Sequence, residues 1–264
     1  MVSELLSRAF PNKWLGQPAT AQNVVPAVAG FPINGTMLLH AIRLVNRSAT
    51  PGVCAAVALL KDSAWVFGQW TNATTLFTDD TTDAQSAATN DAALETNTSG
   101  DGCIIGATVP FNAVSLDVTT AGAAASDIHS VEYWNGSAWT AMAASSFLVD
   151  IASRAAVWSA GEQTFLFEAP MDWAVGGSGT NVPSTKYNIR IKRTPTTPSA
   201  AALARLVYVG RILWSVKSVA AGAESLLNIA PSHLGLSDTY YAAVGLFVAT
   251  ADNGNVLQLL PRVE

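Results

Sequence analysis

The segment 131–140, VEYWNGSAWT, places short runs of aromatic and β-branched residues on either side of an Asn-Gly pair. Asn135 and Gly136 tolerate the positive φ angles that a type I′ turn requires at both of its central positions. Such a turn reverses the chain within two residues. The segment therefore predicts a tight β-hairpin, and it limits the local fold more than any other stretch of the chain.

The register of this hairpin decides where its bulky side chains lie. A two-residue turn places Trp134 opposite Ser137 and Glu132 opposite Trp139, so that the two tryptophans meet diagonally on one face of the sheet. Tyr133 then points to the other face. A sheet that carries bulk on both faces is typical of one leaf of a β-sandwich, and we expect one face of the tryptophan pair to pack against the core.

Strand-like segments recur along the rest of the chain. Residues 114–118 alternate Val, Leu and Val with Ser and Asp, which predicts a half-buried strand. Two apolar runs within 36–60 are separated by turn-forming residues at 47–52, and we interpret them as two antiparallel strands. In the same way, the run 240–248 turns at 252–255 into a last strand, which predicts a C-terminal hairpin.

The amino-acid composition of these segments differs between the ends and the middle of the chain. The end segments are rich in Leu, Val and Ala, whereas the middle holds most of the eight tryptophans. This difference predicts an all-β fold with a small outer β-sandwich formed by the N- and C-terminal segments, residues 33–62 plus 206–264. Residues 63–205 then form an inserted jelly-roll-like β-sandwich. A linear pair of domains is the alternative arrangement.

Residues 1–32 contain four of the twelve prolines. Spaced prolines exclude a long helix and favour extended chain, so we interpret this segment as an extended N-terminal arm. We take four of its apolar residues as candidate interaction residues: Phe10, Trp14, Leu15 and Phe31. The arm packs either over its own domain or over a neighbouring subunit, and the sequence leaves both open.

Only 12% of the residues are charged, about half the usual fraction, and the formal net charge is −5. A surface with so few charges has little repulsion to keep copies apart, so we expect a homo-oligomer, with a trimer favoured. The sequence has no basic stripe with interleaved aromatic residues, and we expect no direct nucleic-acid partner. The densest basic run, 190–193, is interpreted as a solvated edge strand.

The sequence offers little that could hold a metal or a cofactor, and we expect neither. Cys54 and Cys103 have no neighbouring His or Cys at a metal-ligand spacing, which predicts two buried thiols. Asp79, Asp80 and Asp83 superficially resemble a cation loop but lack the glycine and the closing glutamate of an EF-hand. The N-terminus lacks the apolar core of a signal peptide, and no apolar run approaches a membrane span, so we expect synthesis in a cytoplasm and no membrane partner.

Five segments in the middle half of the chain form a recognisable series. They are 110–112 (PFN), 116–122 (LDVTTAG), 132–140 (EYWNGSAWT), 170–173 (PMDW) and 187–191 (YNIRI). The series resembles β-sandwich modules in virion proteins of tailed bacteriophages. The flanking segments are similar, more weakly, to the small sandwiches of phage decoration and fibre-associated proteins. The resemblance implies a virion location after synthesis in the host cytoplasm, and it brings no catalytic residues.

Composition, sandwich pattern, arm and resemblance together predict a non-enzymatic virion structural protein. We expect a capsid decoration or cement protein that binds the major capsid protein or other virion proteins and stabilises the shell. The alternative is a tail, baseplate or fibre component that binds a host surface glycan on tryptophan side chains. Its candidates are Trp65, Trp70, Trp134, Trp139, Trp158 and Trp173, although a tryptophan in a β-sandwich is more often core. No nucleophile, base and orienting residue share a coherent spacing, so we do not expect an enzyme.

Overall fold

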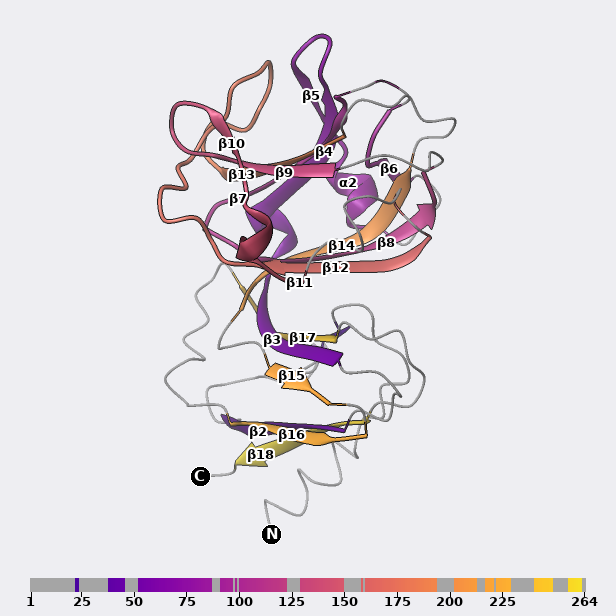
Figure 1. Cartoon of the computed structure of the whole chain (residues 1–264), viewed down its shortest axis with the longest axis vertical. Coiled ribbons are helices and arrows are strands. Elements are labelled where there is room, and N and C mark those ends of the chain that lie inside the picture. The colour runs from indigo at the N-terminus through magenta and orange to yellow at the C-terminus, as the bar shows by residue number, and fades with distance from the viewer. Residues whose placement is uncertain are drawn as a thin grey trace. The chain divides into compact units, whose positions relative to one another are not determined.

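The chain divides into two compact units, whose strands are drawn in Figure 1. Unit 1 comprises Met1–Leu59 and Ile212–Glu264, and unit 2 comprises Leu60–Arg211. Unit 2 is thus inserted into unit 1, and the predicted inserted segment, 63–205, lies within it. The computed structural model describes residues 22–23, 38–45, 52–86, 91–96, 98, 100–122, 129–149, 158, 160–193, 202–212, 217–220, 222–228, 240–248 and 256–262.

Unit 1 holds two small antiparallel sheets, seen one above the other in Figure 1. In the first, β2 lies between β16 and β18. In the second, β17 lies between β1 and β3, and β15 pairs with β3. The strands are β1 (Gln22–Asn23), β2 (Leu38–Val45), β3 (Gly52–Leu60), β15 (Lys217–Val219), β16 (Glu224–Asn228), β17 (Tyr240–Val248) and β18 (Val256–Arg262).

The predicted C-terminal hairpin is wrong, and the two strands predicted within 36–60 do not pair with each other, although all four strands exist. β2 and β3 follow one another in the chain, as do β17 and β18, but β2 pairs with β18 in one sheet while β3 neighbours β17 in the other. Turn-forming residues indicate where a chain reverses. In a sandwich the reversal often carries the chain to the opposite sheet, so a turn alone does not identify the partner of a strand.

Unit 2 contains two larger antiparallel sheets. Sheet I has the strand order β6-β14-β8-β12-β11, and sheet II has the order β10-β9-β13-β7-β4-β5. Figure 1 shows sheet II above sheet I within this unit. The strands are β4 (Trp65–Thr71), β5 (Leu76–Asp79), β6 (Ala92–Ala93), β7 (Gly102–Ala107), β8 (Ala113–Thr120), β9 (His129–Trp134), β10 (Trp139–Ala141), β11 (Phe147–Val149), β12 (Gly161–Phe167), β13 (Tyr187–Arg193) and β14 (Leu203–Ile212). Among the described residues of this unit, three short helices join the strands: η1 (Asp62–Ala64), α2 (Thr81–Ala84) and η2 (Ala144–Ser146).

The connections of these strands identify unit 2 as a jelly roll. Strands β6, β8, β12 and β14 belong to sheet I, and strands β7, β9, β10 and β13 belong to sheet II, so that most connections cross between the sheets. The two four-strand orders, β6-β14-β8-β12 and β7-β13-β9-β10, are those of a jelly roll. Strands β4 and β5 extend sheet II, and β11 extends sheet I. The predicted all-β fold with an inserted jelly-roll-like sandwich is confirmed.

The core of unit 2 lies between its two sheets. The strand predicted at 114–118 is part of β8, and its Val and Leu side chains are at most 1% exposed. At one end of the core, the ring centroid of Trp173 lies 5.0 Å from that of Phe111 and 6.2 Å from that of Phe167. The Trp173 indole N–H donates to the backbone oxygen of Asn188 at 3.1 Å, so this buried ring also has a polar partner.

A buried ion pair accompanies this apolar core. Arg193 lies on the same face of β13 as Ile189 and Ile191, and its Nη1 is 3.2 Å from Oε1 of Glu95. Both side chains are almost completely buried. Burial lowers the pKa of Arg193, and the charge of Glu95 opposes this shift. Burial, with a smaller contribution from Glu95, raises the pKa of Cys103, the buried thiol that the sequence predicted; the side chain of Cys54 lies outside the described residues.

The β9–β10 hairpin exists, but its turn differs from the prediction. Trp139 lies directly opposite Trp134, and a four-residue loop, 135–138, joins the strands. Within this loop only Gly136 has a positive φ, +95°. The side-chain oxygen of Asn135 accepts hydrogen bonds from the backbone N–H of Ser137 at 3.0 Å and of Ala138 at 2.8 Å. This side-chain turn replaces the predicted type I′ turn and moves the register by two residues.

Candidate functional site

The face of sheet II that is turned away from the core carries a row of aromatic and charged side chains. Glu132 and Trp134 alternate along β9 with side chains that face the core, and the pairing places Glu132 opposite Arg190 of β13. The tryptophan pair shares a face, as predicted, but this is the outer face and not the core. We define the tryptophan–arginine layer as the side chains of Trp70, Glu132, Trp134, Trp139, Arg190 and Lys192.

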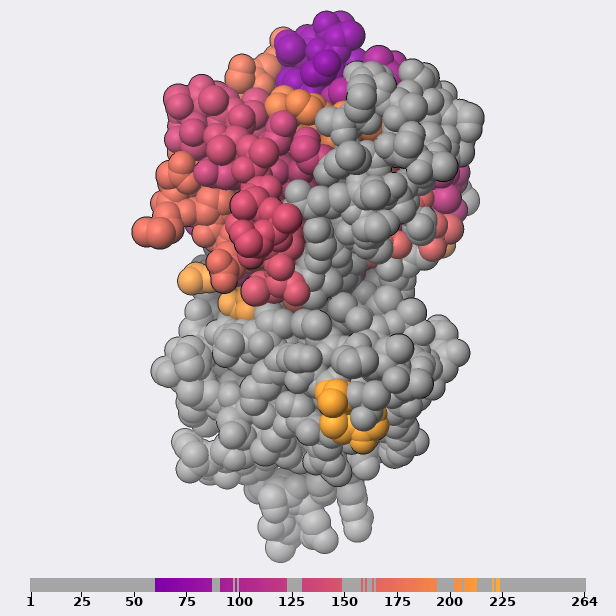
Figure 2. All heavy atoms as spheres, viewed as in Figure 1, coloured from indigo at the N-terminus to yellow at the C-terminus, as the bar shows by residue number. Residues whose placement is uncertain are grey.

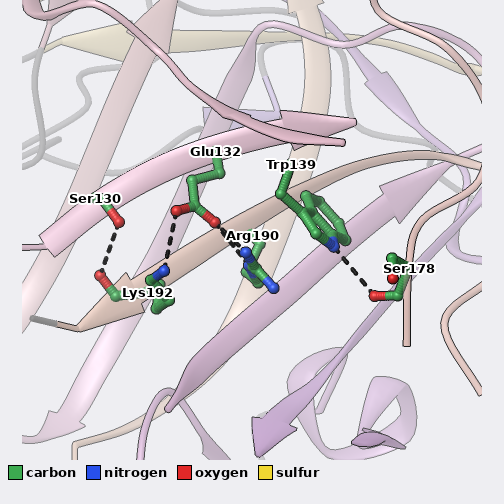
Figure 3. A network of polar contacts seen from close by, with 6 residues as sticks. All are labelled: Ser130, Glu132, Trp139, Ser178, Arg190 and Lys192. Atoms are coloured by element: carbon green, nitrogen blue, oxygen red, sulfur yellow. Dashed lines mark hydrogen bonds and ion pairs between the residues drawn. The ribbon is translucent and has the colours of Figure 1, made fainter. Parts of the chain in front are cut away.

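Arg190 is the centre of this layer. Its guanidinium carbon lies 4.9 Å from the ring centroid of Trp70 and 4.6 Å from that of Trp139, which are cation–π distances. Its Nε donates to Oε2 of Glu132 at 2.8 Å, and its Nη2 contacts the same oxygen. Lys192 Nζ lies 3.2 Å from the other carboxylate oxygen, so one carboxylate holds two cations (Figure 3). The layer therefore has one net positive charge.

The glycine-rich segment 174–186 covers part of the layer. Trp139 donates its indole N–H to the backbone oxygen of Ser178 at 3.1 Å (Figure 3). Val182 packs with Trp70 in a buried cluster that also contains Phe77 and Ile104. Gly179 has a φ of +136°, and a Cβ at this position would lie 2.6 Å from the Trp70 ring. The glycine there is needed for close contact with the Trp70 ring.

The structure shows which of the six tryptophans predicted to bind a glycan are accessible. Four of the six candidate tryptophans are buried: Trp65, Trp70, Trp158 and Trp173. Trp134 and Trp139 are half-buried, and their rings meet edge to face at 5.7 Å with an interplanar angle of 68°. Arg190 lies over the Trp139 ring, so that ring is only partly free for a ligand. The structure thus leaves a two-tryptophan patch in place of a six-tryptophan platform.

The interpretation of the basic run 190–193 as a solvated edge strand is wrong. β13 lies between β9 and β7, well inside sheet II. Arg190 is 8% exposed and Arg193 is 1% exposed. The predicted alternation is correct, because Arg190 and Lys192 share one face and Arg193 points to the other. Carboxylates distant in sequence, Glu132 and Glu95, compensate the two buried arginines, and a local pattern does not reveal them.

A pocket lies on the other side of β9 and β10, at the edge of sheet II. Its volume is about 370 Å³. The lining residues are Tyr133, Ala141, Met142, Ala143, Ser146, Glu168, Ala169, Pro170, Met171 and Asp172. The Tyr133 hydroxyl donates to Oδ1 of Asp172 at 2.8 Å. Burial, together with this hydrogen bond and the charge of Asp172, raises the pKa of Tyr133. Figure 2 shows the segments around β10 and 168–186 as neighbouring parts of the surface of unit 2.

The other predicted positions do not form a described site. Phe10, Trp14, Leu15 and Phe31, like most of the arm, lie outside the described residues. Only the short strand β1 is described in that segment, and it pairs with β17 of the same chain.

The acidic residues that resembled a cation loop have partners within the chain. The Asp79 carboxylate accepts hydrogen bonds from the backbone N–H of Thr81 at 2.9 Å and from its hydroxyl at 2.5 Å. Burial and the charge of Asp83 raise the pKa of Asp80. Among the described residues, no three His, Cys, Asp or Glu side chains gather in a way that could hold a metal ion.

The pocket is a feature that the sequence patterns do not predict. Residues 170–173 belong to one motif and Tyr133 to a hairpin, but no pattern links the two segments. The pocket depends on the position of the 168–172 turn against β9, which lies more than 30 residues earlier. The one local signal in the sequence is that two acidic residues, Glu168 and Asp172, flank the apolar sequence Ala-Pro-Met.

Comparisons with known proteins do not add a relative. No family model matches the sequence, and no curated protein is significantly similar to it. Within the described part of the chain, no helix has the length and apolar character needed to cross a membrane. The functional argument therefore depends on the fold, the surface and the sequence motifs.

Proposed function

We propose that this chain is a non-enzymatic structural protein of a tailed-bacteriophage virion, made in the host cytoplasm, and that it acts as a capsid decoration or cement protein. The observation that carries the proposal is the jelly roll of unit 2, an architecture that recurs in viral capsid proteins. Because the same architecture also occurs in lectins, fold alone does not identify a function. The resemblance of segments 110–191 to phage β-sandwich modules favours the virion role.

The cement mechanism depends on apolar contacts across several shell subunits. A specific interface buries about 1,200–2,000 Å² in total, and a chain with only 12% charged residues loses little charge solvation when it forms one. In this proposal the arm and unit 1 bind the shell, while unit 2 projects from it. Phe10, Trp14, Leu15 and Phe31 are the proposed anchors, since aromatic and large apolar side chains dominate interface energetics.

Virions with and without the protein test this role. Particles that lack the chain should release their DNA at a lower temperature, and added purified protein should restore the higher one. A variant with all four anchors replaced by alanine should fail to restore it, while the far-ultraviolet circular dichroism of the variant, which reports its β-sheets, stays unchanged. Equal release temperatures for particles with and without the chain would exclude a cement function.

The oligomeric state is a separate part of the proposal. We expect a trimer, because low surface charge permits self-association and closed symmetric assemblies are usual for structural proteins. Size-exclusion chromatography with light scattering should then give three times the chain mass of 27.5 kDa. A mass of 27.5 kDa at micromolar concentration would contradict the trimer. It would not contradict the decoration role, because a monomer can also decorate a capsid, and the virion experiment tests that role separately.

A tail or fibre protein that binds a host surface glycan is the second candidate. The observation that favours it is the half-buried Trp134 and Trp139 pair on the outer face of sheet II. Indole rings of this kind can stack on a sugar ring. A glycan array tests the idea, and Trp134→Ala should then abolish the signal while Trp158→Phe, a buried control, should not. Absence of binding to any surface polysaccharide of the host would remove this candidate.

A further inference from the structure

The pocket beside β9 combines an apolar floor with an acidic rim. Met142 is 5% exposed and forms part of the floor, whereas Glu168 and Asp172 are exposed at the rim. No lysine, arginine or histidine is among the ten lining residues. With a volume of about 370 Å³, the pocket is at the small end of the range for ligand sites, which suits a single side chain better than an extended molecule.

The hydrogen-bonding side chains of the pocket are nearly all acceptors. The Tyr133 hydroxyl already donates its proton to Oδ1 of Asp172, which leaves its oxygen lone pairs and the second carboxylate oxygen of Asp172 as acceptors. Glu168 adds two more acceptor oxygens. Ser146 is the one lining side chain with a hydroxyl proton free of any such fixed role. The complementary ligand is therefore one that donates and does not accept.

This requirement separates cationic side chains from sugars. A sugar hydroxyl both donates and accepts, so a sugar site normally offers donors as well as acceptors. Arginine has five N–H donors and lysine has three, and neither has an acceptor. Two carboxylates also make the hydrogen bonds to such a group charge-assisted, which shortens and strengthens them. An anionic ligand would meet two negative charges without a compensating cation.

The apolar walls suit the stem of such a side chain. Lys and Arg bury their methylene groups along apolar surface while the charged end stays hydrated or paired. Met171 is fully exposed at the rim, and its flexible thioether side chain can close over an inserted stem.

We propose that this pocket binds the arginine or lysine side chain of a partner protein, with Glu168 and Asp172 holding the cation and Met142 and Met171 holding its stem. The inference goes beyond the virion role and does not depend on it, because it concerns the chemistry of the isolated chain. The expected contact is a single inserted cationic residue within a larger interface.

Methionine methyl groups give a direct readout in the full-length protein. The chain has four methionines, Met1, Met37, Met142 and Met171, and two of them line the pocket. With ¹³C-methyl methionine, an Nα-acetyl-arginine N-methylamide titration should shift the Met142 and Met171 signals and leave the other two unchanged. The matching citrulline derivative, which is neutral and nearly the same shape, should bind at least tenfold more weakly.

Charge-removing variants test the assigned carboxylates. Glu168→Gln and Asp172→Asn should each weaken binding of the arginine derivative about five- to tenfold, and the double variant should abolish the methyl shifts. Asp62→Asn removes an exposed carboxylate outside the pocket and should leave the affinity unchanged. The substitutions keep the side-chain shape, and the new amide oxygen at position 172 can still accept the hydrogen bond from Tyr133, so folding should persist.

Three results would overturn the proposal. Equal affinity for the arginine and citrulline derivatives would exclude recognition of charge. Methyl shifts with methyl glycosides but not with the arginine derivative would assign the pocket to a sugar. No shift at Met142 or Met171 up to about 50 mM arginine derivative would show that the pocket does not bind the group. None of these results bears on the virion proposal, which is tested on particles.

Discussion

Each face of strand β13 carries a buried arginine, and the surroundings of the two arginines differ. Arg193 points into the sandwich core and meets Glu95, and both side chains are at most 1% exposed. Arg190, three residues earlier, points to the outer face, where it meets Glu132 and lies against two tryptophan rings, with 10% of its side chain exposed. The core pair depends on mutual charge compensation in a dry environment. The outer pair has, in addition, aromatic faces and a loop that covers it.

The two arginine–glutamate pairs should contribute to stability in different ways. Removing one member of a fully buried ion pair leaves an uncompensated charge, which costs more than the pair itself contributes. On the outer face the same change exposes a cation that lies near solvent and keeps its ring contacts. The core pair should therefore be the more sensitive of the two, although each joins one arginine of β13 to one glutamate.

The largest expected effect comes from Glu95→Gln. The substitution removes the negative charge 3.2 Å from Arg193 and keeps the side-chain size. We expect a loss of about 3 to 5 kcal/mol in the free energy of unfolding, measured by urea denaturation followed by tryptophan fluorescence. The double variant Glu95→Gln with Arg193→Met should recover much of the loss, because it removes both charges of this pair. A loss below about 1 kcal/mol for Glu95→Gln would contradict the comparison.

Gly179→Ala should disrupt the packing of segment 174–186 against the outer face of sheet II. The new methyl group would lie 2.6 Å from the Trp70 ring, at a φ of +136° that an L-residue rarely adopts. Strain and overpacking together should cost about 2 to 3 kcal/mol. Gly222→Ala is a suitable control, since this glycine also has a positive φ but a Cβ there would meet no atom within 4 Å. A smaller effect at Gly179 than at Gly222 would show that segment 174–186 does not need its close contact with Trp70.

Arg190→Lys separates charge from shape on the outer face. Lysine keeps the positive charge but loses the planar guanidinium that lies between Trp70 and Trp139 and donates to Glu132. We expect a loss of about 1 to 2 kcal/mol in unfolding free energy by the same denaturation experiment. Lys192→Arg, a reverse exchange at a more exposed position, should change it by less than about 0.5 kcal/mol. If Arg190→Lys left the free energy of unfolding unchanged, the positive charge alone would be enough to stabilise this face.

Trp139→Phe gives the smallest and most local effect. Phenylalanine keeps an aromatic ring against Arg190 but cannot donate to the backbone oxygen of Ser178. We expect a loss of about 1 kcal/mol, together with faster amide hydrogen exchange confined to segment 174–186. Trp134→Phe is the matched control, because it alters the neighbouring ring of the same hairpin. Equal exchange rates in the two variants would indicate that the Ser178 hydrogen bond does not hold the loop.

The sequence was sufficient for the fold class because its signals are local. Alternation at 114–118 and the hairpin at 131–140 are strand patterns that do not depend on distant partners. The sequence predicts strand pairing less well, since β2 and β3 follow one another in the chain and yet belong to different sheets. A turn pattern carries no information about which sheet the next strand enters.

The site was harder to predict than the fold for the same reason. The run 190–193 is predicted to be a solvated edge strand because a basic run is usually exposed. The carboxylates that allow its two arginines to be buried, Glu132 and Glu95, lie far away in the sequence. The hairpin pattern correctly predicts that Trp134 and Trp139 share one face of the sheet. The burial state of this pair and the acidic pocket depend on how segment 168–186 folds over the hairpin, which no local pattern encodes.

Cryo-electron microscopy of virions purified from cells that express this chain tests the central claim most directly. The proposal predicts density for a jelly roll of the unit 2 topology at regular, symmetry-related positions on the outer surface of the capsid. Mass spectrometry of the same particles should find the chain in many copies. Complete particles that contain neither the density nor the chain would contradict the assignment to the virion.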